Sequence, residues 1–227
     1  MTTILFIPYR DRDEHLMVFR RKAVPLLRRH IDDLKIVLVE QAPGKLFNKG
    51  KLLNAGFPAY MHTPYLRYII NHDIDIIPDE HAVSNFYTKR GSDVVRIYAD
   101  HDHCLGGINM FRKEAYIQSN GYPCDIWGWG IEDRALYCRV LMSGLRILNV
   151  GRGTKGRFKR LHHSSNAEEY MDEKQRQSDI WKPSSLMQLS KEEIDAFCNR
   201  NGINDVAYRV VSQTTIENNF ENLIVEL

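Results

Sequence analysis

The sequence has few cysteines, no long hydrophobic run and almost no excess of charge. Its four cysteines are scattered without C-x-x-C spacing, so we expect free thiols rather than a cysteine-bound zinc site. No window approaches the roughly 20 apolar residues that are needed to span a bilayer. The 31 Lys and Arg residues nearly balance the 29 Asp and Glu residues, which gives no reason to expect binding to nucleic acid or to an anionic membrane.

The amino-terminal segment lacks the features of a secretory signal. It enters a short apolar run directly, without a basic region, a long hydrophobic core or a cleavage site. We therefore expect a cytoplasmic protein without an integral membrane segment, either free or peripheral to a membrane. At 227 residues, without internal repeats or low-complexity tracts, the chain fits one domain with a substantial core.

Strand-like and helix-like segments alternate in the first third of the chain. Apolar runs predict strands at 3–8, 34–40 and 66–71, and the spacing of apolar residues predicts helices at 14–30 and 48–61. This alternation predicts an α/β fold with a mainly parallel sheet and right-handed crossovers. Later segments predict helices at 134–142, 167–178 and after the capping residue Ser190, and strands at 145–150, 206–212 and 222–227.

Charged side chains follow two of these predicted strands. Arg10 and Arg12 come just after the first strand, at the edge where open α/β sheets bind ligands, and arginine forks suit phosphate. A solvated basic turn is the alternative. Asp73 and Asp75 follow the third strand, and we expect both carboxylates to project the same way and Pro78 to end the strand. Such oxygens suit Mg²⁺ or Mn²⁺ that also holds a diphosphate, although a lone D-x-D is a weak signal.

The segment 127–133 reads W-G-W-G-I-E-D and places acids beside flat aromatic faces. An indole face packs well against a sugar ring, and Gly128 and Gly130 allow the backbone to approach a ligand closely. The carboxylates of Glu132 and Asp133 then lie where a sugar hydroxyl would arrive. Two acids in the first turn of a helix also interact favourably with its positive end. For this segment alone, a role of Glu132 and Asp133 in starting the helix therefore explains them as well as a role in sugar binding does.

A histidine pair follows a basic, glycine-rich run. The run 151–157 is poor in apolar residues and could fold over a bound phosphate as a lid. His162 or His163 could then complete a metal site begun by Asp75, because borderline metals accept imidazole. A surface histidine pair is the alternative.

Together these segments resemble the β-1,4-galactosyltransferase family, glycosyltransferase family 7. The matching segments are 6–12, 47–57, 72–78, 106–107 with the lysine-containing turn after it, and 120–133, and the tail 202–210 resembles the branch of the family that adds galactose to xylose. The resemblance covers nearly the whole chain and rests on the order of the motifs. The sequence shows no segment that matches the family's membrane anchor and stem, from which we expect a bacterial or viral member.

The resemblance implies a single GT-A catalytic domain over 1–227. Its nucleotide-binding half would be 1–100, and its acceptor-binding half would be 101–227 with a metal-binding lid at about 151–165. The implied activity is inverting, metal-dependent transfer of galactose or N-acetylgalactosamine from a UDP-sugar to a hydroxyl of a glycan acceptor, with a β-1,4 linkage, in polysaccharide biosynthesis. The implied cofactor is Mn²⁺ or Mg²⁺, and the implied donor is UDP-galactose or UDP-N-acetylgalactosamine.

The resemblance also implies roles for individual residues. Contacts to the UDP-sugar are implied for Pro8, Tyr9, Arg10, Arg12, Phe47, Asn48, Lys49 and Asp73. Metal ligation is implied for Asp75 and His163, with His162 as the nearest candidate for a further lid ligand. The substrate site is implied to contain Cys104, Gly106, Gly107, Trp127, Gly130, the closing Trp129 and the sugar-binding acid Glu132. Asp133 is the implied catalytic base.

Two positions depart from the family pattern. Lys49 stands where the family commonly has arginine, which keeps the charge but loses the bidentate fork. Cys104 stands where galactose-specific members have a tyrosine that crowds the C2 position of the donor sugar. The smaller side chain leaves room there, which makes N-acetylgalactosamine a credible alternative to galactose.

Two other functions would use some of the same residues as glycosyl transfer. A nucleotidyl or phosphoryl transferase would also use arginines, paired aspartates and a cation, but it would not need W-G-W-G beside a base. A non-catalytic carbohydrate-binding module would use the tryptophans, but not the D-x-D motif with a histidine lid. The sequence determines neither the glycan acceptor, because acceptor loops follow no general code, nor the oligomeric state.

Overall fold

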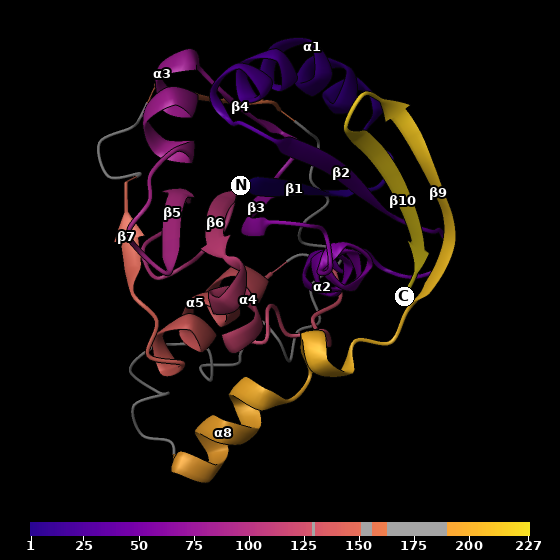
Figure 1. The fold of residues 1–227 in the computed structure, drawn as a ribbon. Coiled ribbons are helices and arrows are strands. Elements are labelled where there is room, and N and C mark those ends of the chain that lie inside the picture. Colours follow the sequence, from indigo (N-terminus) through magenta and orange to yellow (C-terminus); the bar gives the residue numbers. More distant parts are fainter. Residues whose placement is uncertain (129, 151–155, 163–189) are drawn as a thin grey trace.

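The structure is a computed structural model that describes residues 1–128, 130–150, 156–162 and 190–227. Within these residues, an eight-stranded sheet has the order β7-β5-β6-β3-β1-β2-β10-β9, and a two-stranded sheet pairs β4 with β8 (Figure 1). The strands are β1 (Thr2–Tyr9), β2 (Leu34–Gln41), β3 (Leu66–His72), β4 (Ile76–Pro78), β5 (Val94–Tyr98), β6 (Ile108–Arg112), β7 (Ile147–Asn149), β8 (Phe158–Arg160), β9 (Arg209–Glu217) and β10 (Phe220–Glu226).

The centre of the large sheet is parallel. Strand β1 pairs in parallel with β2 on one side and with β3 on the other, and β2 pairs in parallel with β10. All eight residues of β1 are buried, which explains the continuous apolar run that predicted it, because a strand covered on both faces does not alternate with polar residues. Antiparallel pairs form toward the edges, between β3 and β6, β5 and β6, and β9 and β10.

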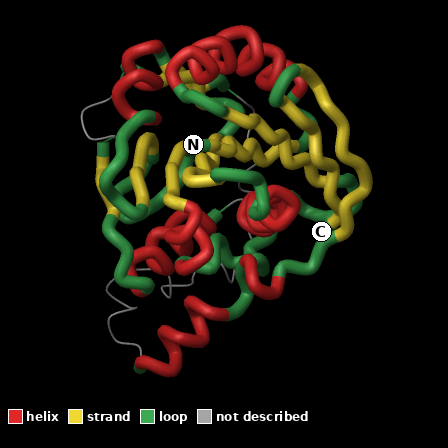
Figure 2. The backbone as a smooth tube through the Cα atoms, viewed as in Figure 1, coloured by secondary structure: helices red, strands yellow, loops and turns green. Residues whose placement is uncertain are grey.

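Helices cover both faces of this sheet (Figures 1 and 2). One face packs against α1 (Asp13–His30), α3 (Glu80–Ala82) and the π-helix η1 (Val83–Tyr87), and the other against α2 (Lys49–Tyr60), α4 (Lys113–Gln118) and α5 (Glu132–Met142). Alternate residues of β1 supply the two cores: Ile4 and Phe6 belong to the cluster that contains α2, whereas Leu5 and Ile7 belong to the cluster that contains α1.

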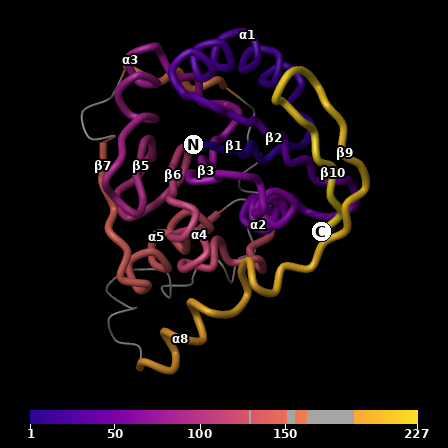
Figure 3. The backbone as a smooth tube through the Cα atoms, viewed as in Figure 1, coloured from indigo at the N-terminus to yellow at the C-terminus, as the bar shows by residue number. Residues whose placement is uncertain are grey.

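The carboxyl-terminal segment joins the amino-terminal half of the sheet. After α8 (Lys191–Asn199) and the 3₁₀ turn η3 (Ile203–Asp205), the β9–β10 hairpin adds to β2, and Figure 3 shows this last segment beside the first strands. The capping box predicted at Ser190 is present, with Glu193 as its reciprocal partner. Arg139 is fully buried in α5 and donates to the carbonyls of Arg200 and Asn201, which ties this segment to the helix that carries Glu132 and Asp133.

The sequence-based elements are confirmed over the first 72 residues, with boundaries that shift by one or two residues. One expectation is wrong: Pro78 does not end the strand before the D-x-D motif. Strand β3 ends at His72, because the chain turns when Ile76 N–H donates to the carbonyl of Asp73, and Ile76–Pro78 forms the separate strand β4. The predicted helix at 167–178 lies outside the described residues. In the described ranges, no helix is both long and apolar enough to cross a membrane.

Candidate active site

Lys49 begins α2 at the centre of a group of acids. The start of this helix is fixed by Asn48, which is fully buried and whose Oδ1 accepts a hydrogen bond from Lys51 N–H at 2.8 Å. The Asn48 amide also donates to the Cys124 carbonyl, and its backbone N–H donates to the Gln41 side chain, both at 2.8 Å. The cap therefore joins the end of β2, the start of α2 and the segment that leads to the W-G-W-G motif.

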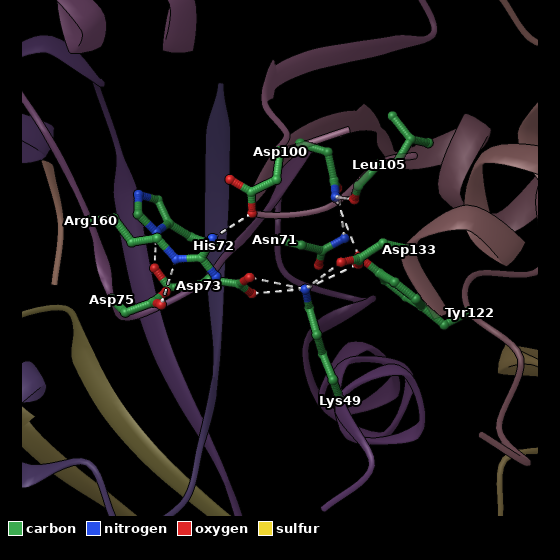
Figure 4. A network of polar contacts seen from close by, with 11 residues as sticks. Lys49, Asn71, His72, Asp73, Asp75, Asp100, Leu105, Tyr122, Asp133 and Arg160 are labelled. Atoms are coloured by element: carbon green, nitrogen blue, oxygen red, sulfur yellow. Dashed lines mark hydrogen bonds and ion pairs between the residues drawn. The ribbon is translucent and has the colours of Figure 1, made fainter. Parts of the chain in front are cut away.

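The ammonium group of Lys49 lies between two carboxylates from distant parts of the chain (Figure 4). Its Nζ is 3.0 Å from Asp73, just past β3, and 3.0 Å from Asp133, in the first turn of α5. Burial alone would lower the pKa of Lys49, but the charges of Asp133 and Asp73 raise it well above its ordinary value. Lys49 is therefore a positive charge at neutral pH, and it brings one acid of the D-x-D motif to the predicted catalytic base.

Burial raises the pKa values of two acids in this group, Glu132 and Asp73. Burial, followed by the charge of Asp133, raises the pKa of Glu132 to about 8, although Lys49 lowers it. Burial and the neighbouring carboxylates of Asp133 and Asp75 raise the pKa of Asp73 to about 7, again against the effect of Lys49. Glu132 Oε2 is buried and has no hydrogen-bond partner in the described part of the chain. A buried polar atom of this kind is suited to binding a ligand.

The two glycines of segment 105–107 leave room for these acids. A β-carbon at Gly106 would lie 2.5 Å from Asp133 Oδ2, so any side chain there would displace the carboxylate. Gly107 has a φ of 69°, a conformation that favours glycine, and its carbonyl accepts from Asp73 N–H at 2.8 Å. Leu105 N–H donates to the Asp133 carbonyl at 2.9 Å. The same short segment thus positions both Asp73 and Asp133.

A second group of predicted residues gathers around Phe47. Arg10 donates to the Lys45 carbonyl at 2.7 Å, and its guanidinium lies 5.4 Å from the centre of the Phe47 ring. The Phe47 carbonyl accepts from Gly128 N–H at 2.7 Å, and the Trp127 ring lies 5.7 Å from Lys45 Nζ. The arginine segment after β1, the segment before α2 and the first half of W-G-W-G are therefore in contact with one another.

The remaining predicted residues occupy the following places. Pro8 and Tyr9 are buried in β1, and the Tyr9 hydroxyl donates to Asp13, while Arg12 occupies the amino-terminal capping position of α1. Gly130 is half-buried, and its carbonyl accepts a hydrogen bond from Glu132 N–H. Cys104 is buried, and its thiol donates to the His101 carbonyl. Trp129 and His163 lie outside the described residues. All four cysteines are free thiols.

Asp75 has a different cationic partner from Asp73. Its Oδ2 lies 3.4 Å from Nε of Arg160, at the end of β8, and Arg160 Nη1 lies 2.6 Å from Asp100 (Figure 4). Leu161 N–H donates to the Asp75 carbonyl at 2.7 Å, so β8 continues directly against the acid. The described part of the predicted lid, 156–162, is therefore a strand segment beside the D-x-D motif.

A divalent cation fits the chemistry of Asp75. In the described residues, no cluster of three or more His, Cys, Asp and Glu side chains is arranged to hold a metal ion. Such a cluster is not required, because Mg²⁺ is commonly held by one or two carboxylates together with the phosphates of a substrate. The guanidinium of Arg160 against Asp75 shows that a cation is already favoured there. His162 is exposed, and its carbonyl faces the His15 ring at 3.3 Å.

Arg160 and Asp100 were not identified from the sequence. Arg160 lies in the basic segment just before the histidine pair, and the histidines are the residues that the sequence pattern indicates as metal ligands. Asp100 follows β5, a strand that the apolar pattern did not predict. The alternation of acids at Asp100 and Asp102 just past a strand is the signal that could have found it.

Family models match most of the chain. The model for the N-terminal region of glycosyl transferase group 7 matches residues 1–88, and the model for the N-terminal domain of galactosyltransferase matches residues 88–164. Human β-1,4-galactosyltransferase 1 is 30% identical over 166 residues, which are 70% of this chain and 42% of the human protein. Human β-1,4-galactosyltransferase 5 is 31% identical over 172 residues, 72% of this chain and 44% of that protein. The chain thus spans less than half the length of these relatives.

Solved structures share the fold. A mutant of Drosophila β-1,4-galactosyltransferase 7, in complex with manganese, UDP-Gal and xylobiose, superposes with a TM-score of 0.74 at 23% identity and covers 100% of this chain and 94% of its own. The catalytic domain of the same fly protein with xylobiose gives a TM-score of 0.73 at 24% identity over the same shares. These likenesses confirm the predicted GT-A fold class.

The burial of Glu132 predicts a pH dependence of stability. Its pKa is about 8 in the folded chain against an ordinary 4.5, so the folded state binds more protons in this window and stability falls as pH rises through it. Replacing Glu132 by Gln, which cannot ionise, should flatten this fall, as measured by urea unfolding between pH 5 and 8. Glu192→Gln on the exposed face of α8 is the matched control. An unchanged slope in Glu132→Gln would show that Glu132 ionises normally.

Proposed function

Because this chain belongs to the glycosyltransferase group 7 family, we propose that it moves galactose or N-acetylgalactosamine from a UDP-sugar to a hydroxyl of a glycan acceptor. The proposed reaction inverts the anomeric centre, depends on a divalent metal and forms a β-1,4 linkage. The observation that carries the proposal is the Lys49 bridge, because it places the predicted base Asp133 and the predicted donor-site acid Asp73 on one ammonium group. A cytoplasmic location stays a prediction from the sequence.

Asp133 has the environment that a general base for a sugar hydroxyl needs. Its side chain is 23% exposed, so a hydroxyl can reach it, and Lys49 holds the carboxylate in place. Gly106 lies against the same carboxylate, and because glycine has no side chain, it does not cover the carboxylate. When the acceptor hydroxyl lies within hydrogen-bond distance of Asp133, the carboxylate takes the hydroxyl proton. At the same time the acceptor oxygen attacks the anomeric carbon from the face opposite to the leaving diphosphate. A single displacement of this kind inverts the centre.

The donor would lie between the arginine segment and the D-x-D motif. Arg10 and Arg12 supply positive charge for the diphosphate, and Phe47, already under the Arg10 guanidinium, supplies an aromatic face. Asp75, with His163 and His162, would hold Mn²⁺ or Mg²⁺. When bound, this ion neutralises the negative charge that develops on the leaving diphosphate.

The acceptor would enter over the tryptophans. Trp127 is half-buried and presents its ring beside Lys45, and Glu132, in the first turn of α5, has a buried oxygen without a hydrogen-bond partner in the described ranges. In the protonated form that its raised pKa favours at neutral pH, Glu132 donates as well as accepts a hydrogen bond, which suits a sugar hydroxyl.

Asp133→Asn should separate binding from catalysis. We expect the variant to retain binding of UDP-sugar with Mn²⁺ by calorimetry, because the amide keeps the shape of the carboxylate. Transfer to a panel of glycosides, including a β-xyloside and an N-acetylglucosaminide, should fall by about 10²- to 10⁴-fold, as for loss of a general base. Asp125→Asn, which changes an exposed acid of the same segment, is the control. Full turnover in Asp133→Asn, or release of a nucleotide other than UDP, would refute the proposal.

Cys104 provides a test of donor choice. With the native thiol, we expect transfer from both UDP-galactose and UDP-N-acetylgalactosamine. Cys104→Tyr should lose most of the N-acetylgalactosamine transfer and keep galactose transfer, since the larger ring fills the space for the acetamido group. Retained galactose transfer also shows that the variant folds, and Cys104→Ser should use both donors. Equal use of both donors by Cys104→Tyr would discard this explanation of specificity.

A further inference from the structure

Arg160 is held between two carboxylates, and one of them is the proposed metal ligand. Its Nη1 lies 2.6 Å from Asp100 Oδ2, and its Nε lies 3.4 Å from Asp75 Oδ2. Figure 4 shows the guanidinium beside Asp75, apart from the Lys49 bridge to Asp73 and Asp133. The two acids of the D-x-D motif are therefore each balanced by a separate cation of the chain itself.

The strand that carries Arg160 is anchored, so this arrangement is built into the fold. Arg160 is paired with Ile76 in the β4–β8 ladder, directly after the D-x-D motif. Two residues earlier, the Phe158 ring packs against Tyr98 at 5.1 Å and against Phe86 at 6.3 Å. The Tyr98 hydroxyl in turn donates to Asp100 at 3.0 Å. The same aromatic contacts that fix β8 therefore fix the acid that holds Arg160.

The two contacts of Arg160 are unequal. Charge-assisted N–H···O bonds are commonly about 2.7–2.9 Å long, so the Asp100 contact is a strong one and the 3.4 Å contact to Asp75 is a weak one. Asp100 therefore holds the Arg160 guanidinium in position, and Asp75 makes only a weak additional contact with it. A small rotation of the end of the side chain would release Asp75 while the bond to Asp100 remains.

We propose that Arg160 competes with the divalent cation for Asp75 and thereby makes metal binding depend on the nucleotide diphosphate. This inference rests on the proposed function, in which Asp75 ligates the metal. Without nucleotide, a divalent ion at Asp75 must displace one cationic contact and then remain close to a guanidinium that Asp100 holds in place. The diphosphate brings several negative charges to both cations, which removes most of this repulsion. Metal and nucleotide therefore bind as a pair.

Titration with Mn²⁺ alone tests the competition directly. The EPR signal of hydrated Mn²⁺ reports the free ion, so affinity is measured without any turnover. We expect Arg160→Gln to bind Mn²⁺ about tenfold more tightly than the unsubstituted chain in the absence of UDP, the size expected for removing a nearby like charge. At saturating UDP, the difference should shrink to less than about threefold.

Arg157→Gln is the matched control. Arg157 lies three residues before Arg160, its side chain is 50% exposed against 48% for Arg160, and it also pairs with an aspartate, Asp79, at 3.2 Å. This substitution removes the same charge from the same segment without touching Asp75, so Mn²⁺ affinity in the absence of UDP, where no phosphate is present for Arg157 to contact, should not change. If Mn²⁺ affinity rose equally in Arg160→Gln and Arg157→Gln, the change in net charge would explain the effect, and the proposal would be overturned.

A second variant tests the role of Asp100. Asp100→Asn removes the stronger carboxylate contact of Arg160, so that Asp75 is its remaining carboxylate partner among the described residues, and should weaken Mn²⁺ binding without UDP. Combined with Arg160→Gln, the Asp100→Asn change should have no further effect, because Asp100 acts through Arg160. If Arg160→Gln binds Mn²⁺ equally or more weakly than the unsubstituted chain, Arg160 is not a competitor. If Asp75→Asn leaves binding of Mn²⁺ with UDP unchanged, the proposed donor site itself is wrong, which is a separate result.

Discussion

The ammonium group of Lys49 between Asp73 and Asp133 is the contact on which the candidate site depends. It joins the end of β3, the start of α2 and the start of α5, three segments that share no local sequence. Without a cation there, the two carboxylates would face each other in a partly buried space, and each would lose the charge that offsets its desolvation. Two neighbouring residues position the groups that make this contact. Asn48 fixes where α2 begins, and Gly106 leaves the space that the Asp133 carboxylate fills.

The charges of the site are arranged in two sets, each with one cation between two acids. Lys49 forms ion pairs with Asp73 and Asp133, and Arg160 forms ion pairs with Asp75 and Asp100. A diphosphate and a divalent ion would alter both sets at once, since the ion would bind a carboxylate that Arg160 contacts and the phosphates would attract both cations. The proposed dependence of metal binding on nucleotide is therefore a property of the whole charge arrangement.

Much of the fold was predictable from the sequence, because β1, β2 and β3 are buried on both faces and so appear as apolar runs. Strands β5 and β6 were not predicted, because they are short and carry the buried polar residues Arg96 and Asn109. The W-G-W-G and D-x-D motifs predicted the candidate site, but the role of Arg160 could not be predicted from its neighbours in the sequence. Its acidic partners Asp75 and Asp100 are 85 and 60 residues away in sequence and come beside it through the β4–β8 pairing and the packing of Phe158 against Tyr98.

The most direct test of the central contact is a double-mutant cycle between Lys49→Met and Asp133→Asn, with the free energy of unfolding measured by urea denaturation at neutral pH. If Lys49 holds Asp133 as described, each single change loses the contact, and the pair should show a coupling free energy of about 1–3 kcal/mol. A coupling near zero would mean that Lys49 and Asp133 do not interact, and that the acids of the two motifs are not brought together by this residue.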